Sequence, residues 1–95
     1  MRDYELISII SPELDEEGIS RIIEKVNKSI GDRGGKVSET SRWGKRRLAY
    51  QFKKFLEGNY ILTRFKLEPK SVKEVSAEIK TSEGVLRHLV VKIGD

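Results

Sequence analysis

Cysteine is absent from the 95 residues of this chain. Its absence excludes disulfide frameworks, cysteine-ligated zinc, iron–sulfur clusters and thiol nucleophiles. Long apolar runs are absent too, since none approaches the roughly 20 residues that a membrane-spanning helix requires. The first residues lack the basic region, apolar core and cleavage site of a secretory signal. We therefore expect a cytoplasmic protein that does not contact a membrane.

Residue patterns that support catalysis or metal binding are scarce. His88 is the single histidine and no serine–carboxylate grouping accompanies it, so we interpret it as a structural or surface residue. The acidic residues within 13–17 lack the spacing of a calcium loop and suit the first turn of a helix. The glycines at 31, 34 and 35 lack the phosphate-loop pattern and suit a helix end. We predict no enzyme activity, no cofactor, no metal and no small-molecule substrate.

Acidic residues are nearly absent from one segment, residues 36–54. The segment holds seven basic residues and one acidic residue, so its formal charge is +6. Because the net charge of the whole chain is +4, the remaining residues together carry −2. Such a concentration of positive charge attracts polyanions. An edge strand protected by cations would explain the alternating lysines. It explains less well the three consecutive basic residues 45–47 beside Trp43, because arginine suits phosphate binding and an exposed tryptophan suits a contact surface.

Apolar periodicity predicts six helices and strands. Period-two alternation indicates strands, and apolar residues at i, i+3, i+4 and i+7 indicate amphipathic helices. In chain order we predict a central strand at 4–10, a helix at 15–32, an extended segment at 36–54 with a bulge or bend at Gly44, a turn at 55–59, a strand at 60–67 that completes a long hairpin, a helix from 68 to about 81 and a strand at 85–93.

The predicted order of elements is strand, helix, strand, strand, helix, strand. It indicates an α+β protein with the ferredoxin-like βαββαβ fold, formed as one domain by residues 1–95. Right-handed crossovers place both helices on one face of a four-stranded antiparallel sheet and leave the other face for partners. Fold alone does not give the function, because enzymes, regulatory domains and RNA-binding proteins share this architecture.

Two functions known for this fold do not match the residues. Acylphosphatase-type enzymes bind phosphate with an arginine in the loop after the first strand, whereas residues 11–13 contain an acidic side chain and no arginine. The RNA-recognition motif stacks bases on sheet aromatics, but residues 57–65 have the wrong glycine–aromatic spacing. We favour phosphate contacts over base stacking. A protein–protein regulatory domain that docks an acidic partner stays open as the alternative.

Four sequence blocks resemble the family of bacterial small-subunit ribosomal protein six. They are MRDYE at residues 1–5, WGKRRLAY at 43–50, EGNY at 57–60 and VLRHLVVK at 85–92. The resemblance covers essentially the whole chain, although Gln51 replaces a proline that is common in the family and the 55–59 segment also differs. It implies a structural role in the small ribosomal subunit. It further implies binding to the central domain of small-subunit ribosomal RNA at the platform, together with small-subunit ribosomal protein eighteen.

The candidate contact residues are the tryptophan and basic side chains that lie in these blocks or elsewhere in the basic segment 36–54. Arg46 and Arg47 match the family's paired arginines, and the resemblance adds basic positions at both ends of the chain. Their division between RNA and protein contacts is left open by the sequence. The predicted RNA- or partner-binding residues are Arg2, Arg42, Trp43, Lys45, Arg46, Arg47, Lys53, Lys54, Arg87 and Lys92.

Overall fold

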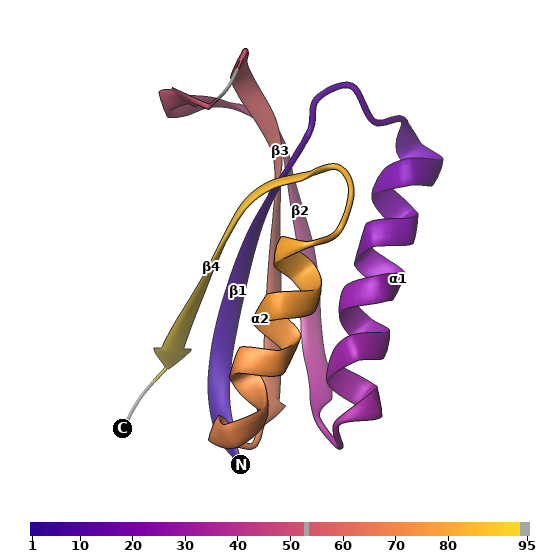
Figure 1. Cartoon of the computed structure of the whole chain (residues 1–95), viewed down its shortest axis with the longest axis vertical. Helices are drawn as coiled ribbons and strands as arrows, with labels where there is room; N and C mark the ends of the chain where they lie inside the picture. Colours follow the sequence, from indigo (N-terminus) through magenta and orange to yellow (C-terminus); the bar gives the residue numbers. More distant parts are fainter. Residues whose placement is uncertain (53, 94–95) are drawn as a thin grey trace.

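A computed structural model of the chain describes residues 1–52 and 54–93. Its strands form one antiparallel sheet in the order β2-β3-β1-β4. Both helices lie on the same side of this sheet (Figure 1). The predicted ferredoxin-like fold and the central position of the first strand are therefore confirmed. The elements are β1 (Arg2–Ile10), α1 (Glu16–Asp32), β2 (Lys36–Phe52), β3 (Phe55–Leu67), the short 3-10 turn η1 (Pro69–Ser71), α2 (Val72–Lys80) and β4 (Val85–Ile93).

The hydrophobic core lies between the helices and the inner face of the sheet. Leu6 and Ile10 of β1 are fully buried, as the alternation of residues 4–10 predicts. The ring of Tyr4 stacks on that of Phe65 in β3, with centroids 5.6 Å apart. Burial of these side chains is the main source of stability in so small a domain. The apolar stripe of α1 supplies the opposite wall through Ile19, Ile22, Val26 and Ile30.

Local signals in the sequence set both ends of α1. The Asp15 carboxylate caps the first turn, because its Oδ1 accepts a hydrogen bond of 2.8 Å from the backbone N–H of Gly18. The helix stops before Gly34, which has a φ of +80°. A Cβ on Gly35 would lie 2.7 Å from the carbonyl oxygen of Lys66. These glycines therefore end the helix and let the chain pass close to β3.

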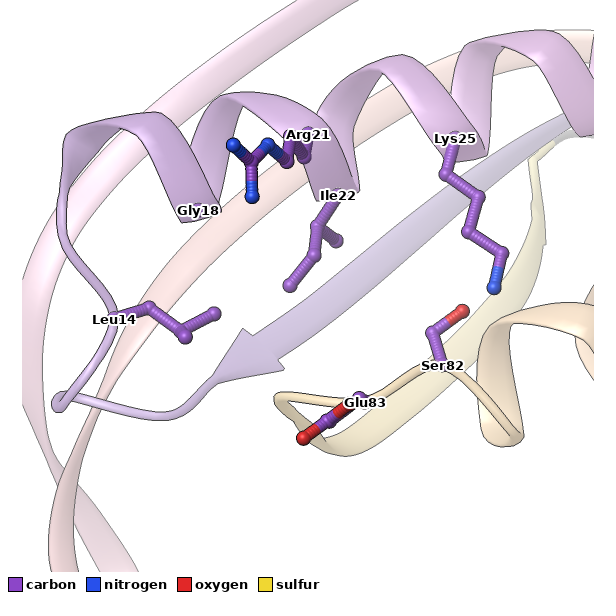
Figure 2. A pocket seen from close by; sticks show the side chains of 7 residues that line it. All are labelled: Leu14, Gly18, Arg21, Ile22, Lys25, Ser82 and Glu83. Atoms are coloured by element: carbon purple, nitrogen blue, oxygen red, sulfur yellow. The ribbon is translucent and has the colours of Figure 1, made fainter.

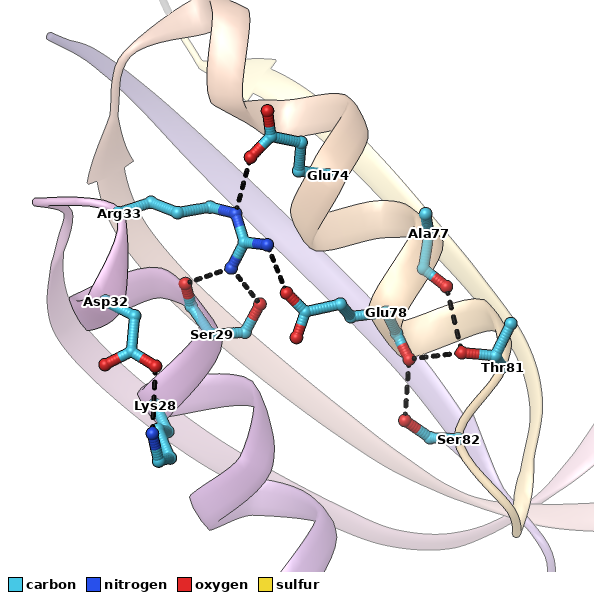
Figure 3. Close-up of polar contacts among 9 residues, drawn as sticks. All are labelled: Lys28, Ser29, Asp32, Arg33, Glu74, Ala77, Glu78, Thr81 and Ser82. Atoms are coloured by element: carbon cyan, nitrogen blue, oxygen red, sulfur yellow. Dashed lines mark hydrogen bonds and ion pairs between the residues drawn. The ribbon is translucent and has the colours of Figure 1, made fainter.

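A polar network joins the two helices (Figure 3). The Arg33 guanidinium donates from Nε to Glu74 at 2.9 Å and also pairs with Glu78, both on α2. Its Nη1 donates to the Ser29 carbonyl oxygen at 3.1 Å. The pKa of Arg33 is raised above its ordinary value, and the hydrogen bond to Glu74 is the largest cause. The network holds the end of α1 against α2 and so fixes the helical layer over the sheet.

The predicted bulge in the second strand is present at Gly44. Pairing passes from Arg42 opposite Ile61 to Gly44 opposite Tyr60, so that Trp43 is the extra residue on β2. Gly44 has a φ of +81°, a conformation that glycine adopts without strain. The strand nevertheless continues beyond the bulge and runs through residue 51 to Phe52.

The predicted turn at residues 55–59 is wrong. β3 begins at Phe55, which pairs with Phe52, and Lys54 lies in the turn. Gly58, which the sequence suggested as a turn residue, instead allows β3 to pass close to β1. A Cβ on Gly58 would lie 2.5 Å from the Cγ2 atom of Ile9.

The β2–β3 hairpin extends beyond the rest of the sheet. Pairing of β1 with β3 ends at Ile10 opposite Asn59. Residues 46–52 and 54–58 therefore form a two-stranded projection, called here the hairpin arm (Figure 1). The start of β1 and the end of β4 lie at the opposite end of the molecule. The long hairpin predicted from the sequence is thus confirmed, with its tip further out than expected.

Candidate nucleic-acid interface

The hairpin arm carries exposed cations. Arg46, Arg47 and Lys54 are all exposed, and within the described part of the chain no carboxylate forms an ion pair with them. The guanidinium carbon of Arg46 lies 5.4 Å from the centroid of the Trp43 ring, at cation–π distance. The Lys54 Nζ atom lies 5.8 Å from the ring centroid of Phe55. Arg46 and Lys54 thus lie against aromatic rings, and all three cations are left available to an anion.

An aromatic pair lies at the base of the arm. Trp43 stacks on Tyr60 with ring centroids 6.4 Å apart and planes 6° from parallel. Trp43 is the only tryptophan in the sequence, and its large apolar ring remains 41% exposed. The bulge at Gly44 positions this ring, because the extra residue turns it toward the face of the sheet that lacks helices. Lys45 is exposed beside it, opposite Asn59.

Arg42 has a different environment from the arm arginines. Its Nη1 and Nη2 atoms donate to the two carboxylate oxygens of Glu16, at 2.7 and 2.9 Å. This forked hydrogen bond lowers the pKa of Glu16 and raises that of Arg42. The pair ties β2 to the first turn of α1. Arg42 is thus engaged within the chain on the helical side, whereas the arm cations are not.

The remaining candidates divide between the two ends of the sheet. Arg87 pairs in register with Ile9 and lies near the base of the arm. Arg2 lies opposite Leu67, and Lys92 lies opposite Tyr4. Arg2 is seven residues from Ile9, which places it about 23 Å away along β1. The structure therefore groups Arg87 with the arm and separates Arg2 and Lys92 from it. Lys53 lies outside the described residues.

The face of the sheet that lacks helices, called here the open face, has an apolar half near the arm. Sequence reasoning left this half unassigned. A hollow of about 300 Å³ is present there. The alternation in residues 85–93 could have indicated part of it, because every second residue at 89, 91 and 93 is apolar. The hollow is lined by Ile7, Ile9, Tyr60, Arg87, His88 and Leu89.

The other half of the open face is charged and internally paired. Arg64 Nε lies 2.8 Å from Glu5, and its Nη1 lies 3.6 Å from Glu39. Lys66 lies 4.0 Å from Asp3 in the next row toward the chain ends. Exposed pairs of this kind contribute little to stability. Their consequence here is that the carboxylates of this half are already matched by cations.

His88 joins β4 to α2. Its Nε2 atom lies 2.6 Å from the Ser76 hydroxyl. Partial burial lowers the pKa of His88 below its ordinary value of 6.5, and the positive charge of Lys80 adds to this effect. This partnership supports the interpretation of His88 as a structural residue.

The lowered pKa of His88 predicts a pH dependence of stability. The folded state holds the neutral imidazole, so its contribution is present above the unfolded pKa and lost as pH falls through the folded pKa. We expect the wild type to lose more stability than His88→Gln between about pH 8 and pH 5. Urea unfolding midpoints of both proteins at the two pH values test this. Equal losses in both proteins would show that protonation of His88 does not oppose folding.

A second hollow lies on the helical side, between α1 and the loop before β4 (Figure 2). It has a volume of about 330 Å³ and an apolar floor of Leu14 and Ile22. Arg21 at its rim pairs with Glu17 at 2.6 Å, and the Ser82 hydroxyl donates to the Glu78 carbonyl oxygen. Arg21 and Ser82 are thus engaged locally, and the described residues that line the hollow form no nucleophile–base pair. Among residues 1–52 and 54–93 no cluster of possible metal ligands occurs, and no helix could span a membrane.

The chain is an α+β protein with a ferredoxin-like fold that presents a basic arm, a stacked Trp43–Tyr60 pair and an open sheet face. Comparison with known proteins makes the assignment specific. The family model described as Ribosomal protein S6 matches residues 3–92. The chain therefore belongs to the ribosomal protein S6 family. It is a structural component of the small ribosomal subunit in the cytoplasm and not an enzyme.

Individual relatives agree with the family match. The chain is 39% identical to small ribosomal subunit protein bS6 of Desulforudis audaxviator, over 97% of this chain and 98% of that protein. It is 40% identical to bS6 of Carboxydothermus hydrogenoformans, over 97% and 96% of the two chains. The crystal structure of 30S ribosomal protein S6 from Thermotoga maritima superposes with a TM-score of 0.89 at 32% identity, covering 96% and 86%.

Proposed function

We propose that the chain binds small-subunit ribosomal RNA directly through its hairpin arm, as one domain. The binding site on the RNA is the central domain at the platform, where small-subunit ribosomal protein eighteen binds jointly with this chain. The observation that carries the proposal is the exposure of Arg46, Arg47 and Lys54 without carboxylate partners among the described residues. Neutralisation of RNA phosphates by such cations releases counterions and drives association.

The candidate residues have different roles in this proposal. The arm cations, together with Lys45, contact phosphates, and Trp43 holds the guanidinium of Arg46 in place through its ring. Arg87 extends the contact surface across the open face. Phosphate contacts fix the position of the chain on the RNA without reading its sequence. Arg2 and Lys92 form a second contact at the far end of the sheet, Lys53 is assigned to the arm by its place in the sequence, and Arg42 acts by fixing β2 to α1.

The proposal is supported by the geometry of the arm. A projection two strands wide can approach a folded RNA without bringing the helical side into contact. Away from the arm, arginines form ion pairs with carboxylates of the same chain, as Arg33 does with Glu74 and Arg64 does with Glu5. Family membership also favours an RNA-bound role over the alternative of a regulatory protein–protein domain.

Salt dependence of binding tests the proposal. We expect the chain and protein eighteen together to bind a central-domain RNA fragment with a slope of about −4 to −5 in a log–log salt plot, if six phosphates are contacted. Filter binding between about 50 and 200 mM salt measures this slope. A fragment of equal length from another domain of the RNA is the control. Binding that is insensitive to salt would contradict direct phosphate contact, and equal affinity for both fragments would contradict the platform assignment.

A further inference from the structure

Helix α2 separates its acidic and basic side chains onto two different sides. Glu74 and Glu78 both pair with Arg33, so they lie on the side of α2 that faces α1 (Figure 3). Lys73 and Lys80 are seven residues apart, which is two helical turns, so they share one side and lie about 10 Å apart along the axis. That side is turned by about 130° around the axis from the two glutamates. The lysines of α2 therefore point away from α1.

The basic side of α2 borders the outer strand β4. The Ser76 hydroxyl on α2 lies 2.6 Å from Nε2 of His88 on β4, and the charge of Lys80 is near enough to help lower the pKa of His88. Lys92 lies directly opposite Tyr4, which is buried beneath the helices, so Lys92 also projects to the helical side of the sheet. Figure 1 shows the end of β4 and the start of α2 at the same end of the molecule.

Four exposed lysines thus line this side of the molecule. The lysine flank, as it is called here, comprises Lys70 of η1, Lys73 and Lys80 of α2 and Lys92 of β4. Within the described part of the chain, none of them has an ion pair or a hydrogen bond. The sequence of β4 contains no acidic residue. Of the nearby acids, Glu68 pairs with the N-terminal ammonium and Glu83 lines the hollow beside α1. Like charges gathered without carboxylates attract a polyanion.

The composition of the lysine flank indicates which polyanion it fits. A protein–protein interface has an apolar centre and is depleted in lysine. Among the described residues, the large exposed apolar side chains lie on the strands and at Met1, and none lies on η1 or α2. A lysine ammonium binds phosphate as a compact point charge. The flank therefore suits the phosphate backbone of a nucleic acid better than an acidic protein.

The lysine flank is too far from the hairpin arm to share its phosphates. The arm and the start of α2 lie at opposite ends of the molecule (Figure 1), whose longest Cα extent is 37 Å. Salt screens charges beyond about 8 Å at physiological ionic strength. Cations at the two places therefore act on different anionic groups, and an RNA that contacts both must present two separate stretches of backbone.

We propose that the lysine flank binds a second stretch of ribosomal RNA phosphates, so that the chain bridges two segments of the RNA. The proposal rests on the proposed function, because it assumes that the hairpin arm holds the first segment. It extends the contact at Lys92 along the outer side of α2 through Lys73 and Lys80. The helical side of the molecule then takes part in RNA binding, whereas the arm alone would leave it in solvent.

Replacing Lys73 and Lys80 together with glutamine tests the lysine flank. We expect the affinity of the full chain, with protein eighteen, for the central-domain fragment to fall about fivefold or more at about 100 mM salt. The log–log salt slope should become shallower by about 1.5, because two phosphates are no longer neutralised. Filter binding measures both quantities. Thermal unfolding checks that the variant folds, as its exposed positions predict.

Two matched variants show whether the position and the sign of the charge matter. Lys25→Gln with Lys28→Gln makes the same change on the exposed side of α1 and should bind RNA within about twofold of the wild type. Lys73→Arg with Lys80→Arg keeps both charges and should also bind as the wild type does. A loss in either control as large as in the glutamine variant of α2 would overturn the proposal. Unchanged affinity and slope in that glutamine variant would overturn it as well.

Two further measurements separate this proposal from its alternatives. Isothermal titration with protein eighteen in the absence of RNA should give equal affinities for the wild type and the Lys73→Gln/Lys80→Gln variant. Weaker binding by the variant would identify a protein as the occupant and overturn the proposal. Combined with Arg46→Ala and Arg47→Ala, the fold losses in RNA affinity should multiply, since distant sites act independently. A loss only from the lysine changes would refute the arm and keep the flank, and a loss only from the arginine changes would do the reverse.

Discussion

Replacing Arg46 and Arg47 together with alanine is expected to weaken binding to the ribosomal RNA complex by about a hundredfold or more, because two charge-assisted hydrogen bonds to phosphate at about 1.5–3 kcal/mol each amount to about 3–6 kcal/mol. The log–log salt slope should become shallower by about 2, since two phosphates are no longer neutralised. Both side chains are exposed on the arm, so the fold should be retained. Filter binding with the central-domain fragment and protein eighteen measures both quantities.

The control for this variant removes the same charge from the opposite side of the molecule. Arg21 and Lys25 lie one turn apart on α1, and both are exposed. Their double replacement by alanine lowers the net charge equally, so general attraction to a polyanion falls by the same amount. RNA affinity close to that of the wild type is expected. Equal losses in the two double variants would mean that net charge, rather than the arm, controls binding.

Phe65→Ala is expected to cost about 3–5 kcal/mol of unfolding free energy, as replacements of buried phenylalanines do. Phe65 is 1% exposed and stacks on Tyr4 at the centre of the core. The loss is a large share of the roughly 5–15 kcal/mol that stabilises a domain. Urea unfolding followed by circular dichroism gives the value. A loss below about 1 kcal/mol would show that the core closes around the cavity far better than its packing suggests.

Tyr60→Ala on the same strand provides the contrast. Tyr60 is half-buried and faces the open side, where its ring meets Trp43. Its removal should cost much less stability than Phe65→Ala, because its ring lies at the surface and leaves no sealed cavity. The pair of variants separates the two faces of β3. Comparable destabilisation by both would contradict the assignment of Tyr60 to an accessible surface.

Periodicity was a reliable guide where elements are regular. The stripe of α1 and the alternation of β1 depend on local spacing, and both place the predicted residues in the core. The turn predicted at 55–59 failed because Gly58 has a role that depends on a partner far along the chain. It allows β3 to pass close to Ile9 of β1. A glycine that forms a turn and a glycine that makes room for a neighbouring strand cannot be told apart in a single sequence.

The candidate site was predictable only in part for a similar reason. Exposure of Arg46 and Arg47 follows from their place in a basic run that protrudes from the sheet. The engagement of Arg42 with Glu16 could not be predicted, because the two residues are 26 positions apart and meet only when α1 covers the sheet. The hollow likewise depends on register, since Ile7 and Leu89 become neighbours only through pairing of the first and last strands.

Gly58 gives the arm and the hollow a common contact. It belongs to the arm, yet it is buried against Ile9, which forms part of the hollow's floor. Any coupling between two ligands that bind one chain is reciprocal. Whatever factor the protein partner adds to the affinity for RNA, RNA must add equally to the affinity for the partner. The order in which the two arrive on this chain therefore cannot change the stability of the finished assembly, only which intermediate is populated on the way.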